Sequence, residues 1–104
     1  MARFRVLVTN SAEQDIASIV QYIREELHSP LTAKRYYEGL MEHLRWLADH
    51  ASVLPIQPDF PSYNDGLPTR RLNYKNVAII YTISGRDVYV YHIVAQKLIT
   101  YGDY

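Results

Sequence analysis

A chain of 104 residues without a cysteine can bury one modest hydrophobic core, but it can form neither a disulfide nor a thiolate metal site. Its 11 Lys and Arg balance its 11 Asp and Glu, and this neutral sum argues against a domain whose main role is to coat nucleic acid. No segment reaches the roughly 20 apolar residues of a membrane span. We therefore expect one cytoplasmic domain over residues 1–104, with no attachment to a membrane.

The N-terminal part of the chain predicts a strand and then a helix. Apolar side chains alternate with others over residues 3–9, which indicates a strand with one buried face. Asn10 begins a run of capping side chains with Glu or Gln three residues on, so a helix should start there and end near His28. The side chains expected to be buried are Phe4, Val6 and Val8 on the strand, and Ile16, Ile19, Val20, Ile23 and Leu27 on the helix.

A second helix should begin at Ser29-Pro30, because Ser can cap a helix and Pro is tolerated in its first turn. It should end near His50, and the short turn before it predicts an antiparallel helical hairpin. Residues 51–66 contain three prolines and an Asn-Asp-Gly turn, so we expect an irregular connection there. The buried face of the second helix would consist of Ala33, Tyr36 or Tyr37, Leu40, Leu44 and Leu47.

Three short strands joined by two tight turns should follow, with the turns at Lys75-Asn76 and at residues 84–87. The predicted fold class is α+β in the order β-α-α-β-β-β. The N-terminal strand and the C-terminal antiparallel meander form one sheet, and the two-helix hairpin packs on one face. The other face, which would include Ala78, Ile80 and Thr82, is expected to be open to solvent and able to carry a groove. The side chains expected to face the helices are Val77, Ile79, Tyr81 and Ile83.

Positive charge is concentrated in the C-terminal sheet, where an anion-binding surface is therefore expected. Arg70 and Arg71 are adjacent on a strand and point to opposite faces, so only one of them can face a groove. A phosphate or carboxylate contact and a structural role remain equally open for that arginine, and the same holds for Lys97 beside Gln96. From residue 69 onward the cations are Arg70, Arg71, Lys75, Arg86 and Lys97, against Asp87 and Asp103.

His92 is the one histidine expected on the sheet, where it could act as a general acid or base or could be a structural residue. The other histidines do not have the spacing of metal ligands, so we expect no metal site and no cofactor. Tyr101 lies in a short aromatic tail that could complete an active surface, dock on a partner or fray.

The whole chain resembles the RelE/ParE superfamily of bacterial toxins, which includes plasmid stabilisation system proteins. The matching motifs keep the order and spacing of that superfamily over about 100 residues. They are the Thr-x-Ser-Ala-Glu-x-Asp-Ile run of residues 9–16, Tyr22-Ile23, Ser-Pro-x-x-Ala at 29–33, Arg71-Leu72 and Ile79-Ile80-Tyr81. The resemblance implies the toxin of a type II toxin–antitoxin module, held in a hetero-oligomer by the cognate antitoxin that neutralises it.

Two departures place the chain nearer the ParE-like branch. Ala78 stands where RelE-like messenger RNA endonucleases have a phosphate-binding arginine, and the basic cluster after the last strand is reduced to Lys97. An endonuclease would need that charge to stabilise its transition state. We therefore expect a ParE-like toxin that inhibits an essential target such as DNA gyrase by protein–protein contact rather than by catalysis. The residues expected to contact target or antitoxin are Arg70, Arg71, Gln96, Lys97 and Tyr101.

Two alternatives remain open. The first is a RelE-like, ribosome-dependent messenger RNA endonuclease, whose catalytic residues would be Lys97, His92 and Tyr101, with Arg70 or Arg71 on the phosphate. The second is a non-toxic binding module of the same fold, which the neutral net charge favours.

Overall fold

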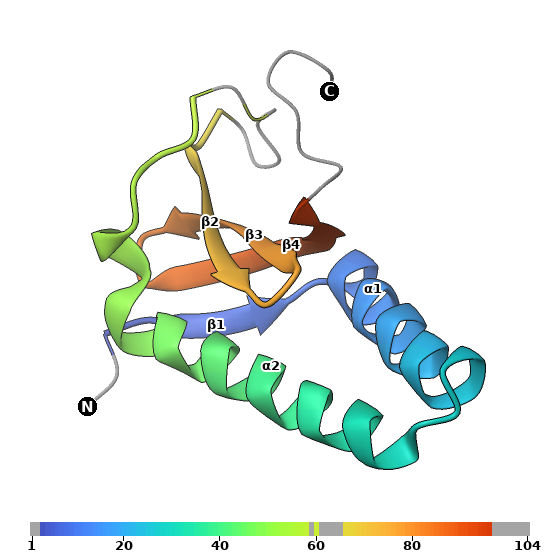
Figure 1. Cartoon of the computed structure of the whole chain (residues 1–104). Helices are drawn as coiled ribbons and strands as arrows, with labels where there is room; N and C mark the ends of the chain where they lie inside the picture. The colour runs from blue at the N-terminus through green and yellow to red at the C-terminus, as the bar shows by residue number, and fades with distance from the viewer. Residues whose placement is uncertain (1–2, 59, 61–65, 97–104) are drawn as a thin grey trace.

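The computed structural model describes residues 3–58, 60 and 66–96. Its elements follow the predicted order β-α-α-β-β-β, so the α+β fold class is confirmed (Figure 1). The elements are β1 (Arg5–Val8), α1 (Asn10–Gln21), the π-helical turn η1 (Tyr22–Glu26), α2 (Pro30–His50), the 3-10 turn η2 (Ala51–Val53), β2 (Thr69–Tyr74), β3 (Val77–Ser84) and β4 (Asp87–Ala95).

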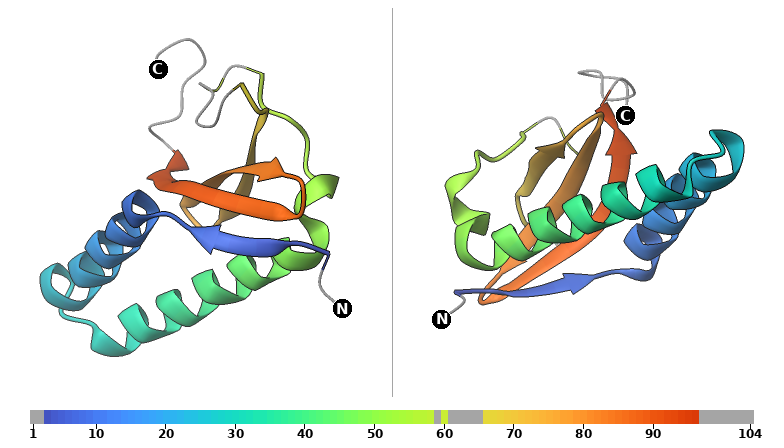
Figure 2. Two further views of the ribbon diagram at one scale, coloured as in Figure 1. Left: turned by 180° about the vertical axis from the view of Figure 1, so that it is seen from behind. Right: turned by 60° about the horizontal axis from the view of Figure 1, so that its bottom comes forward.

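The four strands form one sheet in the order β1-β4-β3-β2. The pairs β2–β3 and β3–β4 are antiparallel, as a meander requires, whereas β1 runs parallel to β4. The first and last strands are therefore neighbours, and β1 and β2 form the two edges. Both helices pack on one side of this sheet (Figure 2).

Helix α1 begins where β1 leaves the sheet, and its N-cap is Thr9 rather than the predicted Asn10 or Ser11. The Thr9 hydroxyl accepts a hydrogen bond from the amide of Ala12 at 3.3 Å and donates one to the carbonyl of Val90 at 2.9 Å. The cap lies one residue earlier than predicted because Thr9 is still extended beside β4 and reaches both partners.

The helical hairpin has the predicted extent. The first helix ends in a π-helical turn before His28, which has a φ of 50°, and α2 spans Pro30–His50. Of the tyrosine pair left open above, Tyr36 is buried in the core and Tyr37 is 45% exposed. The rest of the predicted face of α2 is buried, namely Ala33, Leu40, Leu44 and Leu47.

The core lies between the hairpin and one face of the sheet, where Val77, Ile79 and Tyr81 are buried as predicted. The expectation of an open opposite face is wrong at the centre of β3, since Ala78, Ile80 and Thr82 are all buried. The reason is the position of β3 between two strands. Side chains of both neighbouring strands flank these positions, so that Ile80 lies between Arg71 and His92.

The connection after α2 is irregular, as predicted, apart from the short turn η2. It runs along the free edge of β2. There, Ile56 forms a bridge with Arg70, and the amide of Gln57 donates to the carbonyl of Thr69 at 2.7 Å. The connection thereby covers part of the β2 edge.

Candidate functional site

The outer face of the sheet, opposite the helices, brings two of the predicted site residues into one row. Arg71 and His92 both pair with Ile80, one from β2 and one from β4, and residues paired in this way share a face. Beyond residue 90, β4 is no longer paired with β1, and α1 lies beside this edge. There, Nδ1 of His92 donates to the carboxylate of Asp15 on α1 at 3.2 Å, and the amide of Ile93 donates to the same oxygen at 3.0 Å. This face thus combines a guanidinium with an imidazole oriented by a carboxylate.

Arg70 lies on the helix side of β2, in agreement with the prediction that only one of the two arginines can face the outer groove. Its guanidinium donates to the carbonyls of Ser52, at 3.2 Å, and Leu54. These bonds tie the connection after α2 to β2. Whether Arg70 also contacts a partner stays a prediction.

Gln96, directly after β4, lies at the end of the sheet that holds the β2–β3 turn. Its side-chain amide donates to the carbonyls of Lys75 and Val77, both at 2.9 Å, and its backbone amide donates to the carbonyl of Asn76 at 2.8 Å. The end of β4 is thereby fastened to the β2–β3 turn. Lys97 and Tyr101, the other predicted site residues, lie outside the described residues.

Buried tyrosines on the helix side of the sheet have structural roles. The hydroxyl of Tyr81 donates to the carbonyl of Ala51 at 2.6 Å, and that of Tyr74 donates to the carbonyl of Tyr36 at 3.0 Å. Burial raises the pKa of Tyr81 to about 12, an effect that the nearby Arg70 partly offsets. Burial also raises the pKa of Tyr74 and that of Tyr36.

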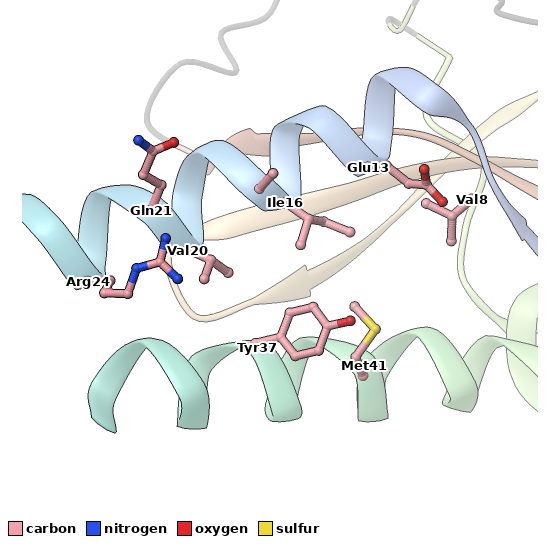
Figure 3. A pocket seen from close by; sticks show the side chains of 9 residues that line it. Val8, Glu13, Ile16, Val20, Gln21, Arg24, Tyr37 and Met41 are labelled. Atoms are coloured by element: carbon pink, nitrogen blue, oxygen red, sulfur yellow. The ribbon is translucent and has the colours of Figure 1, made fainter. Parts of the chain in front are cut away.

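A concave apolar surface lies away from the outer sheet face, where α1, α2 and β1 meet. One cavity of about 480 Å³ opens between the two helices, and Figure 3 shows its lining side chains converging from α1 and α2. A second cavity of about 470 Å³ runs between α2 and β1. Both are lined by Val8 and Met41, so they are adjacent, and we call the two together the hairpin groove. The rest of its lining is Glu13, Ile16, Ala17, Val20, Gln21, Arg24 and Tyr37 in the first cavity, and Val6, Leu44, Arg45 and Ala48 in the second.

Sequence reasoning missed the hairpin groove, although α2 carries a signal for it. Tyr37, Met41 and Ala48 lie beside the core stripe, and together with the core residue Leu44 they form a row at spacings of four, three and four residues. A helix with two adjacent apolar stripes buries one in its own core and offers the other to a neighbour. Charged groups on the lining are two arginines and one glutamate, so the groove is apolar with a slight positive charge.

Comparison with known proteins places the chain in a family. The sequence model described as "ParE toxin of type II toxin-antitoxin system, parDE" matches residues 6–97. The chain belongs to the ParE toxin family. The search of curated proteins found no match to this chain. A solved structure titled "Chromosomal ParDE TA system from P. aeruginosa" is similar, with a TM-score of 0.69 and 18% identity. The alignment covers 89% of this chain and 96% of that one, and it supports the shared fold.

Neither a membrane-spanning helix nor a metal-binding cluster is found in the part of this ParE-family chain that the structure describes. No described helix is long and apolar enough to cross a membrane. Within the same residues, no group of three His, Cys, Asp or Glu side chains is placed to hold a metal ion.

Proposed function

We propose that this chain is the toxin of a type II toxin–antitoxin module, that it inhibits DNA gyrase by protein–protein contact in the cytoplasm, and that a cognate antitoxin neutralises it by filling the hairpin groove. Membership of the ParE toxin family supports the toxin role. Two features of the ParE-like branch, Ala78 and the single Lys97 in place of a basic cluster, support gyrase as the target.

The observation that carries the proposal is the hairpin groove itself. Tyr37 is 45% exposed on its rim, and Met41 lines both of its cavities. Tyr, Met and Arg are the residue types enriched at protein interfaces. The groove therefore fits an apolar protein segment better than a small polar substrate.

The outer sheet face supports a non-enzymatic mode of action. Its described centre holds one arginine, Arg71, and one histidine, His92, around the buried apolar side chains of Ala78 and Ile80. A nuclease must stabilise additional negative charge on the phosphate as the bond breaks, and preorganised cations supply most of that stabilisation. A surface with so little positive charge is better suited to a protein partner.

A RelE-like endonuclease is the second candidate, and one observation favours it. Asp15 orients the imidazole of His92, and Arg71 stands on the same face. A carboxylate that fixes the tautomer of a histidine next to a phosphate-binding cation is a plausible acid/base arrangement. In this reading His92 transfers the proton while Arg71 binds the phosphate.

The test is to induce the chain without an antitoxin in bacterial cells and to follow growth, transcript integrity and chromosomal DNA breakage in the same culture. The proposed function expects growth arrest with DNA breaks and intact transcripts, together with inhibition of purified gyrase in a supercoiling assay. Rapid transcript cleavage, abolished by His92→Ala, would establish the second candidate. Unimpeded growth would identify a non-toxic binding module.

The role of the hairpin groove needs a separate variant pair. Met41→Lys places a charge at the centre of the groove and should prevent rescue of growth by the co-expressed antitoxin. Glu42→Lys introduces the same side chain at the next, exposed position of α2, outside the groove, and should leave rescue intact. Equal rescue of both variants would place the antitoxin elsewhere.

A further inference from the structure

Another cavity, separate from the hairpin groove, lies where the helical hairpin meets one end of the sheet. We call it the end cavity; its lining comes from α1, η1 and α2 and from Asn76, Val77, Ile93 and Ala95 at the sheet end. Its volume is about 480 Å³, which equals that of the first cavity of the groove, and it shares no lining residue with the groove. A molecule in this cavity would be contacted from several sides, by helices and strands together.

The π-helical turn η1 shapes the rim of the end cavity. The amide of Leu27 donates to the carbonyl of Tyr22 at 3.3 Å, across five residues. In an α-helix, side chains five residues apart point about 140° away from each other, whereas the wider π turn brings them toward the same side. Tyr22 and Leu27 both line the cavity, and each is 56% exposed. Single π turns inside helices often mark functional sites.

The described lining of the end cavity carries no charge. It consists of apolar side chains such as Ile23, Val77 and Ile93, together with hydroxyl and amide groups. The hairpin groove, in contrast, has two arginines and one glutamate on its lining. Because burying an unpaired charge costs far more than burying a neutral polar group, the end cavity favours an uncharged occupant.

Tyr36 brings a buried polar group to this lining. The residue is 7% exposed, and among the described residues its hydroxyl has no hydrogen-bond partner. The hydroxyl of Tyr74 bonds to the backbone carbonyl of Tyr36, not to its phenol. Buried polar groups without a partner destabilise a fold and are rare, so this one calls for an explanation. Burial raises the pKa of the Tyr36 phenol, so it remains a donor at neutral and mildly alkaline pH.

We propose that the end cavity binds an uncharged small organic molecule that combines an apolar ring system with one neutral hydrogen-bond acceptor, such as an amide carbonyl. The ring system would lie among Ile23, Val77 and Ile93. The acceptor would take a hydrogen bond from the Tyr36 hydroxyl once the wall adjusts around it. Sites for small molecules have this composition, a mostly apolar cavity of about 300–1,000 Å³ with a few placed polar groups. The inference goes beyond the toxin role and does not depend on it.

The experiment uses the full chain and two probes of the same skeleton, cinnamamide and cinnamate, of which only the second is charged. Each is titrated while the backbone amide signals are followed by NMR. Cinnamamide should give saturable shifts at Ile23, Val77 and Ile93, with a dissociation constant of about 1 mM, as expected for a ligand of this size. Cinnamate should bind at least about tenfold more weakly, because the lining offers its charge no partner.

Two tyrosine variants at neighbouring positions of α2 isolate the hydrogen bond. Tyr36→Phe removes the buried hydroxyl and should weaken cinnamamide binding about tenfold, as the loss of one hydrogen bond implies. It should not lower the stability of the free chain, because no described residue bonds to that hydroxyl. Tyr37→Phe, on the rim of the hairpin groove, is the matched control and should leave the affinity unchanged.

A second pair of variants tests the position of the probe without touching either tyrosine. Ser18 and Ala17 are neighbouring exposed residues of α1, and Ser18 lines the end cavity while Ala17 lines the hairpin groove. Ser18→Phe should fill the end cavity and abolish binding of cinnamamide, whereas Ala17→Phe should leave it intact.

Several results would overturn the inference. They are the absence of saturable shifts at the cavity amides, equal affinity of the two probes, unchanged affinity of Tyr36→Phe, and equal binding by Ser18→Phe and Ala17→Phe. If the cavity amides respond to gyrase or to the antitoxin but not to cinnamamide, the cavity belongs to a protein contact, and the inference is again overturned. Growth arrest is not among these readouts, so the toxin role is tested separately.

Discussion

The two edges of the sheet are built in opposite ways. Along β2, the chain covers its own edge with residues 56–57, and Arg70 and Tyr81 fasten the start of that connection by hydrogen bonds to backbone carbonyls. Along β1, the described residues supply no second neighbouring strand, and the hairpin groove opens beside Val6 and Val8. The first edge is completed within the chain, and the second borders the surface that we assign to the antitoxin. Substitutions on the β2 side should therefore affect folding, and those on the β1 side should affect binding.

The largest effect is expected at Gly39, where α2 crosses β2. A Cβ at this position would lie 2.3 Å from the hydroxyl oxygen of Tyr74, which is buried and bonded to the carbonyl of Tyr36. Gly39→Ala should destabilise the fold by about 3 kcal/mol, because the ring must move and lose its hydrogen bond. Urea unfolding followed by circular dichroism measures the loss. Adding Tyr74→Phe removes the clashing oxygen and should restore part of the stability; a double variant less stable than Gly39→Ala would contradict this explanation.

The next largest effect is expected at Tyr81. Tyr81→Phe leaves the buried carbonyl of Ala51 without the hydrogen bond that it receives from the phenol, which should cost about 2 kcal/mol in the same unfolding assay. A variant as stable as the wild type would show that this bond does not hold the connection.

The raised pKa of Tyr81 makes the stability of the fold depend on pH in the alkaline range. The unfolded phenol ionises near its ordinary pKa of 10, while the folded group stays protonated up to about 12. Between pH 10 and pH 12 the unfolded chain binds fewer protons than the folded chain. The contribution of Tyr81 to the free energy of unfolding is therefore fully present below pH 10 and falls as the pH rises toward 12. Tyr81→Phe should show a shallower fall over this window, with a remainder from Tyr36 and Tyr74, whose pKa values are also raised.

A smaller effect is expected at Arg70, whose bonds to the carbonyls of Ser52 and Leu54 lie nearer the surface. Arg70→Ala should lower the free energy of unfolding by about 1 kcal/mol. Its neighbour Arg71, on the outer face, is the comparison. Arg71→Ala removes cover from Ile80 but breaks none of the bonds to the connection, so it should cost less than Arg70→Ala. If both variants lose equal stability, the assignment of Arg70 to the closed edge is wrong.

The smallest effect on stability is expected in the hairpin groove. Arg45 is an exposed residue on the groove wall beside β1. Arg45→Glu should leave the unfolding transition within about 0.5 kcal/mol of the wild type, but it should weaken binding of an acidic antitoxin segment. Titration at two salt concentrations provides the check, because the difference between wild type and variant should shrink at the higher salt. Tighter binding by the variant would reverse the expected sign of the partner's charge.

Much of the fold could be predicted from the sequence because its signals are local. The alternation in residues 3–9, the stripes of the two helices and the turn residues all act over a few positions. The sequence predicts the N-cap one residue late, because the hydrogen bond that favours Thr9 over Asn10 comes from β4, which only the folded chain brings near. Likewise, the burial of Ile80 depends on Arg71 and His92 from neighbouring strands.

The candidate site was harder to predict, because it depends on contacts between distant segments. The sequence predicts Val8 and Val20 as buried side chains and assigns no role to Met41, and only the tertiary arrangement brings the three together in one groove. The sequence did predict that only one of Arg70 and Arg71 faces outward and that His92 lies on the sheet, but it did not decide which arginine or which face. It could not identify Asp15 as the partner of His92, because the two residues are 77 positions apart.

The neighbourhood of the first and last strands also has a consequence for when the protein can act. Residues 5–8 find their place only beside residues 87–90, so β1 cannot dock until nearly the whole chain has left the ribosome. Pairings of such long sequence separation form late and slowly. A chain released before Asp87 would have neither a docked β1 nor the wall that Val8 contributes to the groove. The surface that we assign to the antitoxin should therefore arise only in the completed protein.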